Sequence, residues 1–416
     1  MNQLDFSEDF FRRESARLVG FLTTRFGLQR LQFAEDVAQE TLVRAMQTWP
    51  YRGMPDNPSA WLTQTAKNVS IDLLRREQNW RDKESDIAAE HSRWLADPVE
   101  ETHEETFADD TLRMIFVCFH PQLSTEAQTA LALRTICGLS PAEIAAAFLT
   151  SEAAISKRLV RARQRIRELA LPFSVPDLEE LSFRLEGVLG TIYLLFNEGY
   201  KASSGESLVR SDLCQEAIRL VSLLAEHPTT RTPRTLALLA LMLLNAARLS
   251  SRTDEAGNLL RLHEQDRLVW DRSMIERGVR CLALAGKGNE LSPYHLEAGI
   301  AACHCLAKDK DSTDWSRILR LYDQLLSLVD SPITRLNRSV ALAQVHGAEA
   351  GLLSMKNLPL ESFYLLHAVR GTFEIERNNL NAAKIHFCKA LDLAQLPSER
   401  RFLISRITEC EVAARR

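Results

Sequence analysis

Apolar residues recur at intervals of three and four along almost the whole chain, the spacing that places them on one face of an α-helix. No stretch shows the alternation of apolar and polar residues that is typical of a half-buried strand. Glycine and proline are sparse, with 16 Gly and 14 Pro among 416 residues, so few breaks interrupt the helical pattern. The pattern predicts an all-α protein.

The first 80 residues predict three helices, near Asp5–Phe26, Gln32–Thr48 and Ser59–Asn79. The segment Tyr51–Pro58 contains a glycine and two prolines, which predicts a loop before the third helix. Ser59 is the expected N-cap of that helix, because a serine oxygen accepts a hydrogen bond from a free helix amide. Residues 1–80 are therefore expected to form one small helical unit.

The rest of the chain divides into three further segments. Residues 81–108 are acidic and weakly periodic, which predicts a partly helical linker. Residues 109–171 predict a second, smaller helical unit. The string LPFSVP at Leu171–Pro176 then interrupts the pattern, and a longer helical array is expected over residues 177–416.

The sharpest local signal lies in the second unit, where serines precede two consecutive helical segments. We expect one helix to end at Gly138, Ser140 to cap a short helix over Pro141–Phe148, and Ser151 to cap a third helix. Ser140 and Glu143, three residues apart, form a capping box. The succession predicts a helix-turn-helix. Its shared core is expected to contain Ile144, Ile155 and Leu159.

Charge is distributed unevenly along this chain, although the formal net charge is only −4. Residues 81–110 contain 3 basic and 11 acidic side chains, whereas Lys157–Arg167 contains six basic residues among eleven and no acid. On a recognition helix, residues near the N-terminus reach base edges while Arg and Lys neutralise phosphates. A solvated basic face on a packing helix is the alternative. The side chains predicted to face DNA are Ser151, Glu152, Ser156, Lys157, Arg158 and Arg161.

Two strings in the first unit narrow the class of DNA-binding protein. EDVAQETLVRAM (Glu35–Met46) and PSAWLTQTAKNVSIDLLRRE (Pro58–Glu77) resemble region 2 of bacterial sigma factors. The helix-turn-helix, with its S-x-x-E-I-A and R-L-x-R-A-R strings, resembles region 4. Residues 1–171 therefore resemble an extracytoplasmic-function (ECF) sigma factor, which keeps only those two regions.

The resemblance implies partners and roles. Asp36, Gln39 and Glu40 would lie on the helix that docks core RNA polymerase, where a polar and acidic face meets a basic coiled coil. The loop at Tyr51–Pro58 and the following helix would read the −10 promoter element, with a base flipped from the melting duplex. The third helix of the helix-turn-helix would read the −35 element. Side chains expected at the −10 element are Asn57, Asn68, Asp72, Arg75 and Arg76.

The acidic linker has two interpretations. In the family resembled, the tether between regions 2 and 4 passes through polymerase channels, and an acidic segment suits a basic tunnel. A soluble entropic spacer is the other interpretation.

The C-terminal segment extends well beyond region 4. Gly371, Ala383, Phe387 and Ala390 have the spacing of tetratricopeptide-repeat (TPR) positions, and the repeat is a 34-residue helix pair. Strings such as LFNEGYKASSG (Leu195–Gly205) and SPYHLEAGIAACH (Ser292–His304) look like recurring strings of the ECF subgroup with a C-terminal TPR-like extension, which residues 177–416 resemble. Stacked helix pairs offer a concave surface to a protein or an intramolecular partner.

Two polar clusters are candidates for that surface, and buried hydrogen-bonded turns are an equal alternative. They comprise Asn197, Glu198, Tyr200, Ser203 and Ser204, and Glu264, Gln265, Asp266 and Arg267. His295, Cys303, His304 and Cys305 are not expected to hold a metal, because adjacent helical residues point to different sides.

The motifs, cysteines and apolar runs of the chain argue against an enzyme, a disulfide-bonded protein and a membrane protein. No phosphate-binding glycine loop, nucleophile elbow, zinc-protease or Rossmann pattern occurs, so we expect neither an enzyme nor a cofactor. The eight cysteines are dispersed, and no apolar run is long enough for a membrane span or a signal peptide, which predicts a cytoplasmic protein. The alternatives to a sigma factor are a helix-turn-helix regulator with a helical-repeat sensor that does not join polymerase, and a TPR-like scaffold with a vestigial DNA module.

Overall fold

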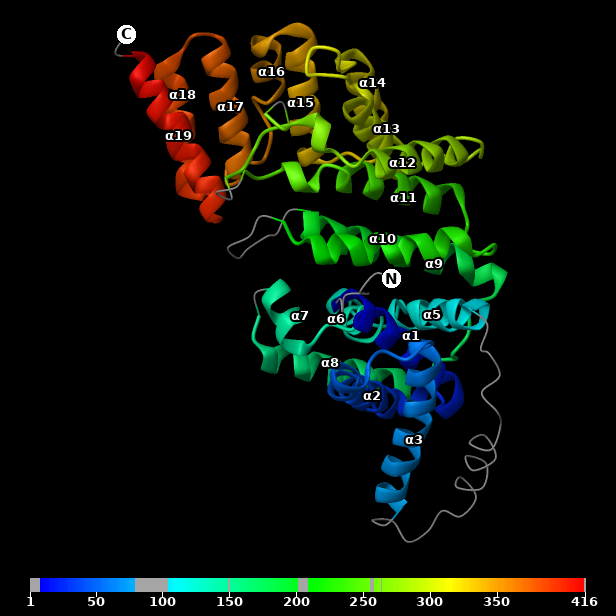
Figure 1. The fold of residues 1–416 in the computed structure, drawn as a ribbon. Helices are drawn as coiled ribbons and strands as arrows, with labels where there is room; N and C mark the ends of the chain where they lie inside the picture. The colour runs from blue at the N-terminus through cyan, green and yellow to red at the C-terminus, as the bar shows by residue number, and fades with distance from the viewer. Residues whose placement is uncertain are drawn as a thin grey trace. The chain divides into compact units, whose positions relative to one another are not determined.

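The computed structural model describes residues 8–78, 104–148, 150–200, 209–254, 258–262 and 264–414. Over these ranges the regular structure is helical, apart from one isolated antiparallel bridge between Thr253 and Leu259. The chain forms two compact units, Met1–Thr191 and Ile192–Arg416, and the boundary falls within helix α9 (Leu178–Tyr200) (Figure 1). The predicted all-helical fold is confirmed.

Three helices open the first unit: α1 (Glu8–Phe26), α2 (Leu31–Arg52) and α3 (Pro58–Gln78). Helix α2 continues past Pro50 and ends at Arg52, and the next residue, Gly53, has a φ of +81°, a backbone conformation that favours glycine. The prediction that the loop begins at Tyr51 was therefore wrong by two residues. The core between these helices is apolar and includes Leu18, Leu22, Val37, Ala38, Leu62 and Val69.

Four shorter helices follow in the same unit, together with the first part of α9. Residues 79–103, which include most of the predicted acidic linker, lie outside the described ranges, and a helix already begins at Glu104. The Thr24 hydroxyl on α1 donates to the Asp110 carboxylate on the first of these helices, with 2.8 Å between the oxygens. The helices are α5 (Glu104–Cys118), α6 (Thr125–Thr135), α7 (Pro141–Ala147) and α8 (Glu152–Glu168).

The second unit is a succession of helices that pack mainly on their neighbours in the chain. Helix α11 (Pro233–Ala246) is apolar on all sides and almost wholly buried, and it packs against α10, α12 and α13. A helix of this kind needs partners on every face to remove its apolar surface from water. The other helices are α10 (Ser211–Glu226), α12 (Arg272–Ala285), α13 (Pro293–Leu306), α14 (Trp315–Leu328), α15 (Pro332–His346), α16 (Ala348–Ser354), α17 (Tyr364–Glu376), α18 (Leu380–Leu393) and α19 (Pro397–Ala414).

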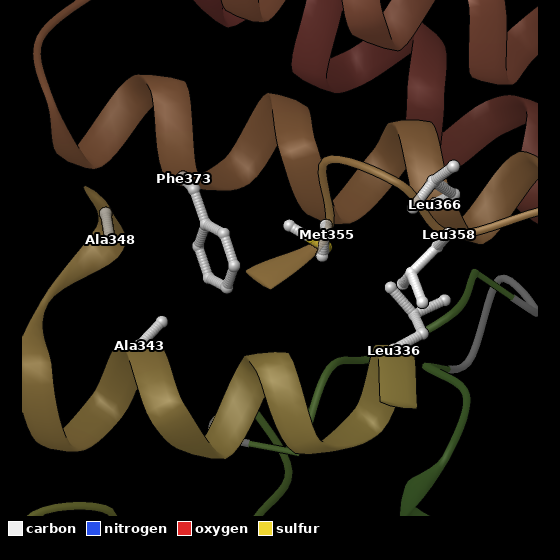
Figure 2. Close-up of a cluster of buried hydrophobic side chains, with 7 residues drawn as sticks. All are labelled: Leu336, Ala343, Ala348, Met355, Leu358, Leu366 and Phe373. Atoms are coloured by element: carbon white, nitrogen blue, oxygen red, sulfur yellow. The ribbon is translucent and has the colours of Figure 1, made fainter. Parts of the chain in front are cut away.

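One of the cores of this unit joins α15, α16 and α17. Figure 2 shows the Phe373 ring of α17 directed toward Ala343 of α15, with Met355 beside it. A side chain at Gly351 would lie 2.7 Å from that ring and 2.8 Å from the Ala343 methyl, so the close approach of α16 requires glycine. The buried members are Leu336, Ala343, Ala348, Met355, Leu358, Leu366 and Phe373.

The next core holds the residues that we matched to TPR positions. Ala383, Phe387 and Ala390 on α18 are fully buried, and a Cβ at Gly371 would lie 2.9 Å from the Phe387 ring. Small residues here allow α17 and α18 to pack closely.

Candidate nucleic-acid interface

A capped helix-turn-helix is built from α6, α7 and α8. The Ser140 hydroxyl accepts from the Glu143 amide at 3.2 Å, and the Glu143 carboxylate accepts from the Ser140 amide at 2.6 Å. The Ser151 hydroxyl accepts from the Ala154 amide at 3.2 Å. Both predicted caps are confirmed, and each satisfies amides that would otherwise have no partner at a helix start.

The core of this motif also agrees with the prediction. Ile144 and Ile155 are fully buried and Leu159 is 2% exposed, so α7 and α8 share an apolar contact. Burial of three aliphatic side chains is worth about 1.5–3 kcal/mol each. The rigid contact fixes the direction in which the polar face of α8 points.

The side chains predicted to face DNA lie on the outer surface of α8. Ser151, Glu152, Lys157 and Arg161 are exposed, whereas Ser156 and Arg158 are half-buried. Lys157, Arg158, Arg161 and Arg165 line one side of a groove of about 470 Å³, and residues around the N-terminus of α6 line the other side. The concentration of cations beside a helix N-terminus suits a phosphate of a nucleic-acid backbone.

Glu126 lies in the first turn of α6. Hydrogen bonds from its own backbone amide and from Ser124 hold the pKa of Glu126 below its usual value, and the charge of Arg158 adds to this effect. The anionic Glu126 therefore lies within electrostatic reach of Arg158 before any DNA is bound.

The start of α3 differs from the prediction. The helix begins at Pro58, and the Asn57 side-chain oxygen accepts from the Ala60 amide at 3.0 Å. Asn57 rather than Ser59 therefore caps α3, because proline is favoured at the first helical position and needs no amide partner. The Ser59 hydroxyl instead donates to the Glu14 carboxylate of α1 at 2.9 Å.

The remaining α3 residues predicted at the −10 element share an exposed face. Asn68, Asp72, Arg75 and Arg76 are exposed, and the Asp72 carboxylate lies 3.8 Å from the Arg44 guanidinium of α2. An exposed ion pair of this kind contributes little to stability, so these side chains remain available to a ligand. The half-buried Trp61 packs edge-on against Trp49, with ring centroids 5.4 Å apart.

The polar residues predicted on α2 form one exposed face. Asp36, Gln39 and Glu40 are all exposed. The Gln32 amide donates to Asp36 at 2.7 Å, and the Arg44 guanidinium donates to Glu40 at 3.0 Å. The Arg134 guanidinium of α6 donates to the Gln39 side-chain oxygen at 3.1 Å. The face is therefore polar and partly acidic, and one of its members is already engaged by the helix-turn-helix.

Sequence reasoning missed the role of Glu35, the residue next to this face. Its carboxylate accepts from the Thr135 hydroxyl of α6 at 2.8 Å and from the Arg163 guanidinium of α8. Burial raises the pKa of Glu35, while the nearby Arg163 opposes that rise. A signal was present, because Glu35 is one turn from Leu31 and Ala38 and so lies on the apolar face of α2.

The two polar clusters of the second unit have different surroundings. Asn197 and Tyr200 line a cavity, and Glu198 is half-buried. Gln265 and Asp266 form turns, since Gln265 donates to the Leu260 carbonyl at 3.1 Å and Asp266 accepts from the Leu268 amide at 2.8 Å. Arg267 donates to the His304 and Ala307 carbonyls at 2.6 and 2.8 Å and lines an adjoining cavity. Ser203 and Ser204 lie outside the described ranges.

The histidines and cysteines of α13 point toward separate neighbours. The Cys305 thiol donates to the Leu244 carbonyl at 3.3 Å, the His304 ring lies edge-on to Trp315, and His295 Nδ1 lies 2.8 Å from the Ser292 hydroxyl. In the part of the chain that the structure describes, no three His, Cys, Asp or Glu side chains gather in a metal-binding group. None of the described helices is long and apolar enough to span a bilayer.

Comparison with known families agrees with this arrangement. Residues 10–81 match Sigma-70 region 2, and residues 113–166 match Sigma-70, region 4. The chain thus belongs to the sigma-70 factors with ECF-type architecture, which are not enzymes. It binds core RNA polymerase and promoter DNA and directs transcription initiation.

The helical C-terminal domain matches a family whose function is unknown. Residues 184–286 match a family of unknown function, DUF6596. The chain is 38% identical to "Uncharacterized protein R00370" of Rhizobium meliloti (strain 1021) over 382 residues, which cover 90% of this chain and 89% of that protein. It therefore belongs to the same family as that protein. No solved structure matches the chain.

Proposed function

We propose that the exposed face of α2 is the polymerase-docking surface of this sigma factor. Asp36, Gln39 and Glu40 would meet a basic surface of core RNA polymerase. The support is their common exposure on one helical face and the absence of any strong ion pair that would neutralise Asp36 among the described residues. Charge complementarity of this kind speeds docking and selects the partner.

The −10 element would be read by the start and outer face of α3. Asn57 lies at the N-terminus of α3 with its side chain exposed and its side-chain oxygen bonded to the Ala60 amide, and Asn68, Asp72, Arg75 and Arg76 continue along the helix. Amide and guanidinium groups can hydrogen-bond base edges, and the arginines can neutralise phosphates.

The −35 element would be read by the outer face of α8. The observation that carries it is the capped, rigidly packed helix whose outer face holds Ser151, Glu152 and Ser156 near the N-terminus and Lys157, Arg158 and Arg161 further along. Base-reading groups near the helix start and cations behind them match the needs of a major-groove helix.

For the C-terminal domain, residues 177–416, we propose a TPR-like helical array that regulates the sigma factor in cis or binds a partner. The close packing of Gly371 against Phe387 supports a helix-pair arrangement at its C-terminal end. We place residues 1–80 as region 2, 81–108 as the linker and 109–171 as region 4, and we expect the protein to act in the cytoplasm, with its polymerase.

Runoff transcription with purified core polymerase and the promoter region of the protein's own gene tests these assignments. We expect transcripts with the full chain and none when α8 carries Lys157→Ala, Arg158→Ala and Arg161→Ala together. Tight binding of promoter duplex by the protein alone, with no core association, would instead support a regulator that does not join polymerase. A chain that ends after Tyr200 tests the C-terminal domain, and unchanged promoter activity and regulation would exclude its regulatory role.

A further inference from the structure

A cavity of about 670 Å³ lies within the second unit, between α9, α11, α13, α14 and α15. This volume is in the range of small-molecule binding sites. Its lining combines aromatic and aliphatic side chains with a few polar groups. The polar groups include Asn197, Tyr200, Arg248, Glu297, His304 and Asn337.

One end of the cavity is cationic. Arg248 has no carboxylate partner in the described part of the chain; its guanidinium donates to the Asn245 side-chain oxygen at 3.4 Å and lies 5.5 Å from the centre of the Tyr200 ring. His304 is close to this guanidinium, and burial together with the charge of Arg248 lowers the pKa of His304 to about 4. His304 Nδ1 is buried and lacks a hydrogen-bond partner. The Arg248 charge is therefore available to an anionic group.

The other end holds a carboxyl group among tyrosines. The Tyr193 hydroxyl donates to Glu297 at 2.7 Å, and the Tyr322 ring lines the same part of the unit. Burial raises the pKa of Glu297, while the hydrogen bond from Tyr193 opposes that rise. A carboxylate beside aromatic rings is an environment that stabilises an ammonium group.

The distance between the two ends of the cavity follows from the helical rise along α13 and α9. Glu297 and His304 are seven residues apart on α13, and Tyr193 and Tyr200 are seven residues apart on α9. Seven helical residues rise about 10 Å. An extended peptide covers about 10 Å with three residues. Asn197 lies one turn from each end of the α9 span, where an amide side chain can hydrogen-bond a peptide group.

We propose that this cavity binds a short zwitterionic peptide of about three residues, with its carboxylate on Arg248 and its amino group at Glu297. Asn197 and Asn337 hydrogen-bond the backbone between the termini, and Tyr200 and Tyr322 contact its side chains. The second unit is thus the sensor of a small peptide, and the ligand requires both charged termini. The proposal concerns the protein alone and does not depend on its binding to polymerase.

The test uses the full chain and synthetic tripeptide mixtures, with saturation-transfer NMR and thermal shift as readouts. Three mixtures are compared: free termini, C-terminal amides and N-acetylated peptides. We expect the free mixture to bind and to raise the melting temperature, and each capped mixture to bind at least tenfold more weakly. Because this comparison uses the unaltered protein, it does not depend on whether variants fold.

Variants of Arg248 and Glu297 test which end of the cavity binds which terminus of the peptide. Arg248→Gln should weaken binding of the free mixture at least tenfold and lose the difference between free and amidated peptides. Glu297→Gln should lose the difference between free and acetylated peptides. Arg280→Gln, at an exposed arginine of α12, is the matched control and should bind as the parent does.

Three results would overturn the proposal: no binding of any free tripeptide, equal binding of the capped mixtures, or unchanged selectivity in both variants. Each of these would leave the sigma-factor assignment intact, because runoff transcription tests that assignment separately. Conversely, a protein inactive in transcription that still selects free tripeptides would retain this site.

Discussion

The Glu35 carboxylate of α2 accepts a hydrogen bond from the Arg163 guanidinium of α8, across 128 residues of chain. Both side chains are largely buried, with exposed fractions of 4% for Glu35 and 12% for Arg163. Together with the Arg134–Gln39 bond, the pair joins region 2 directly to region 4 within one compact unit. The surface proposed for polymerase is therefore tied to the helix proposed for the −35 element.

This contact has a consequence for promoter binding. The −10 and −35 elements are centred about 25 base pairs apart, which is roughly 85 Å along duplex DNA at about 3.4 Å per base pair. The helix proposed for the −10 element, α3, packs on α2, so a bond that holds α8 against α2 keeps the two reading helices too close together to serve both elements. We expect the α2–α8 contact to open when the protein joins polymerase and promoter.

The first prediction follows from the burial of this pair. Arg163→Ala should weaken the α2–α8 contact by about 3–5 kcal/mol, because it leaves the Glu35 carboxylate buried without its cation. Small-angle scattering should report a larger radius of gyration, and the variant should associate with core polymerase faster than the parent. Arg165→Ala, which removes an exposed arginine from the same helix, is the control. An unchanged radius in Arg163→Ala would show that the pair does not hold the unit closed.

A second prediction concerns the polymerase-docking face. Asp36→Arg reverses a charge at an exposed position, so the fold should be retained while core association is abolished. Co-purification with tagged core polymerase measures the effect, and circular dichroism checks the fold. Glu276→Arg, at an exposed acid of α12 in the second unit, should co-purify normally. If Asp36→Arg co-purifies as well as this control, the docking surface lies elsewhere.

Local signals in the sequence were sufficient to predict the helix-turn-helix. Ser140 and Ser151 cap as expected because capping depends on residues only three positions apart. The prediction that Ser59 caps α3 was wrong because Pro58 takes the first helical position, which makes Asn57 the cap and leaves the Ser59 hydroxyl to bond Glu14 of α1.

Contacts between side chains far apart in the sequence could not be predicted from the pattern of apolar and polar residues. Glu35 was visible as an acid on an apolar helical face, but nothing in the sequence identified Arg163 among the six basic residues of its segment. The cavity of the second unit could not be predicted for the same reason, because Arg248 and Glu297 come to line one cavity only when α9, α11 and α13 pack together. The helices are encoded locally, whereas the sites depend on their packing.

A third prediction separates base reading from phosphate binding on α8. Arg158→Ala should weaken −35-dependent initiation by about 1–3 kcal/mol and relax the preference at one base pair, whereas Lys157→Ala should weaken binding to all promoters about equally. Abortive initiation on a panel of −35 variants measures both effects. If Arg158→Ala leaves promoter preference unchanged, this half-buried arginine serves packing or phosphate contact.

A fourth prediction concerns the attachment of α9 to the first unit. The Arg184 guanidinium donates to the Phe116 carbonyl at 2.6 Å and lies 5.6 Å from the centre of the Phe116 ring. Arg184→Ala should destabilise the first unit by about 1.5–3 kcal/mol, because it leaves a buried carbonyl without its charged donor. Urea unfolding measures the loss, with the exposed Arg161→Ala as the control. A chain cut after Leu171 should show the same defect, whereas one cut after Tyr200 should not.

The last prediction is a pH dependence in the second unit. Burial, with help from Arg248 and Arg267, lowers the pKa of His304 from its ordinary 6.5 to about 4, so the folded state favours the neutral imidazole. The corresponding stability is fully present above pH 6.5 and is lost as the pH falls toward 4. Between pH 7.5 and pH 5 the loss should be about 2 kcal/mol. The buried Glu297 has a raised pKa and acts in the opposite direction, so the comparison must be made between variants.

His304→Gln removes the titrating group and keeps a polar side chain at the same place on α13. Urea unfolding of the full chain at the two pH values, fitted for the transition of the second unit, should show a smaller acid destabilisation in His304→Gln by about 2 kcal/mol. His346→Gln, which replaces an exposed histidine of α15, should follow the parent at both pH values. Equal acid sensitivity of the parent and His304→Gln would mean that His304 is not held neutral, and that the cationic end of the cavity does not depend on Arg248 alone.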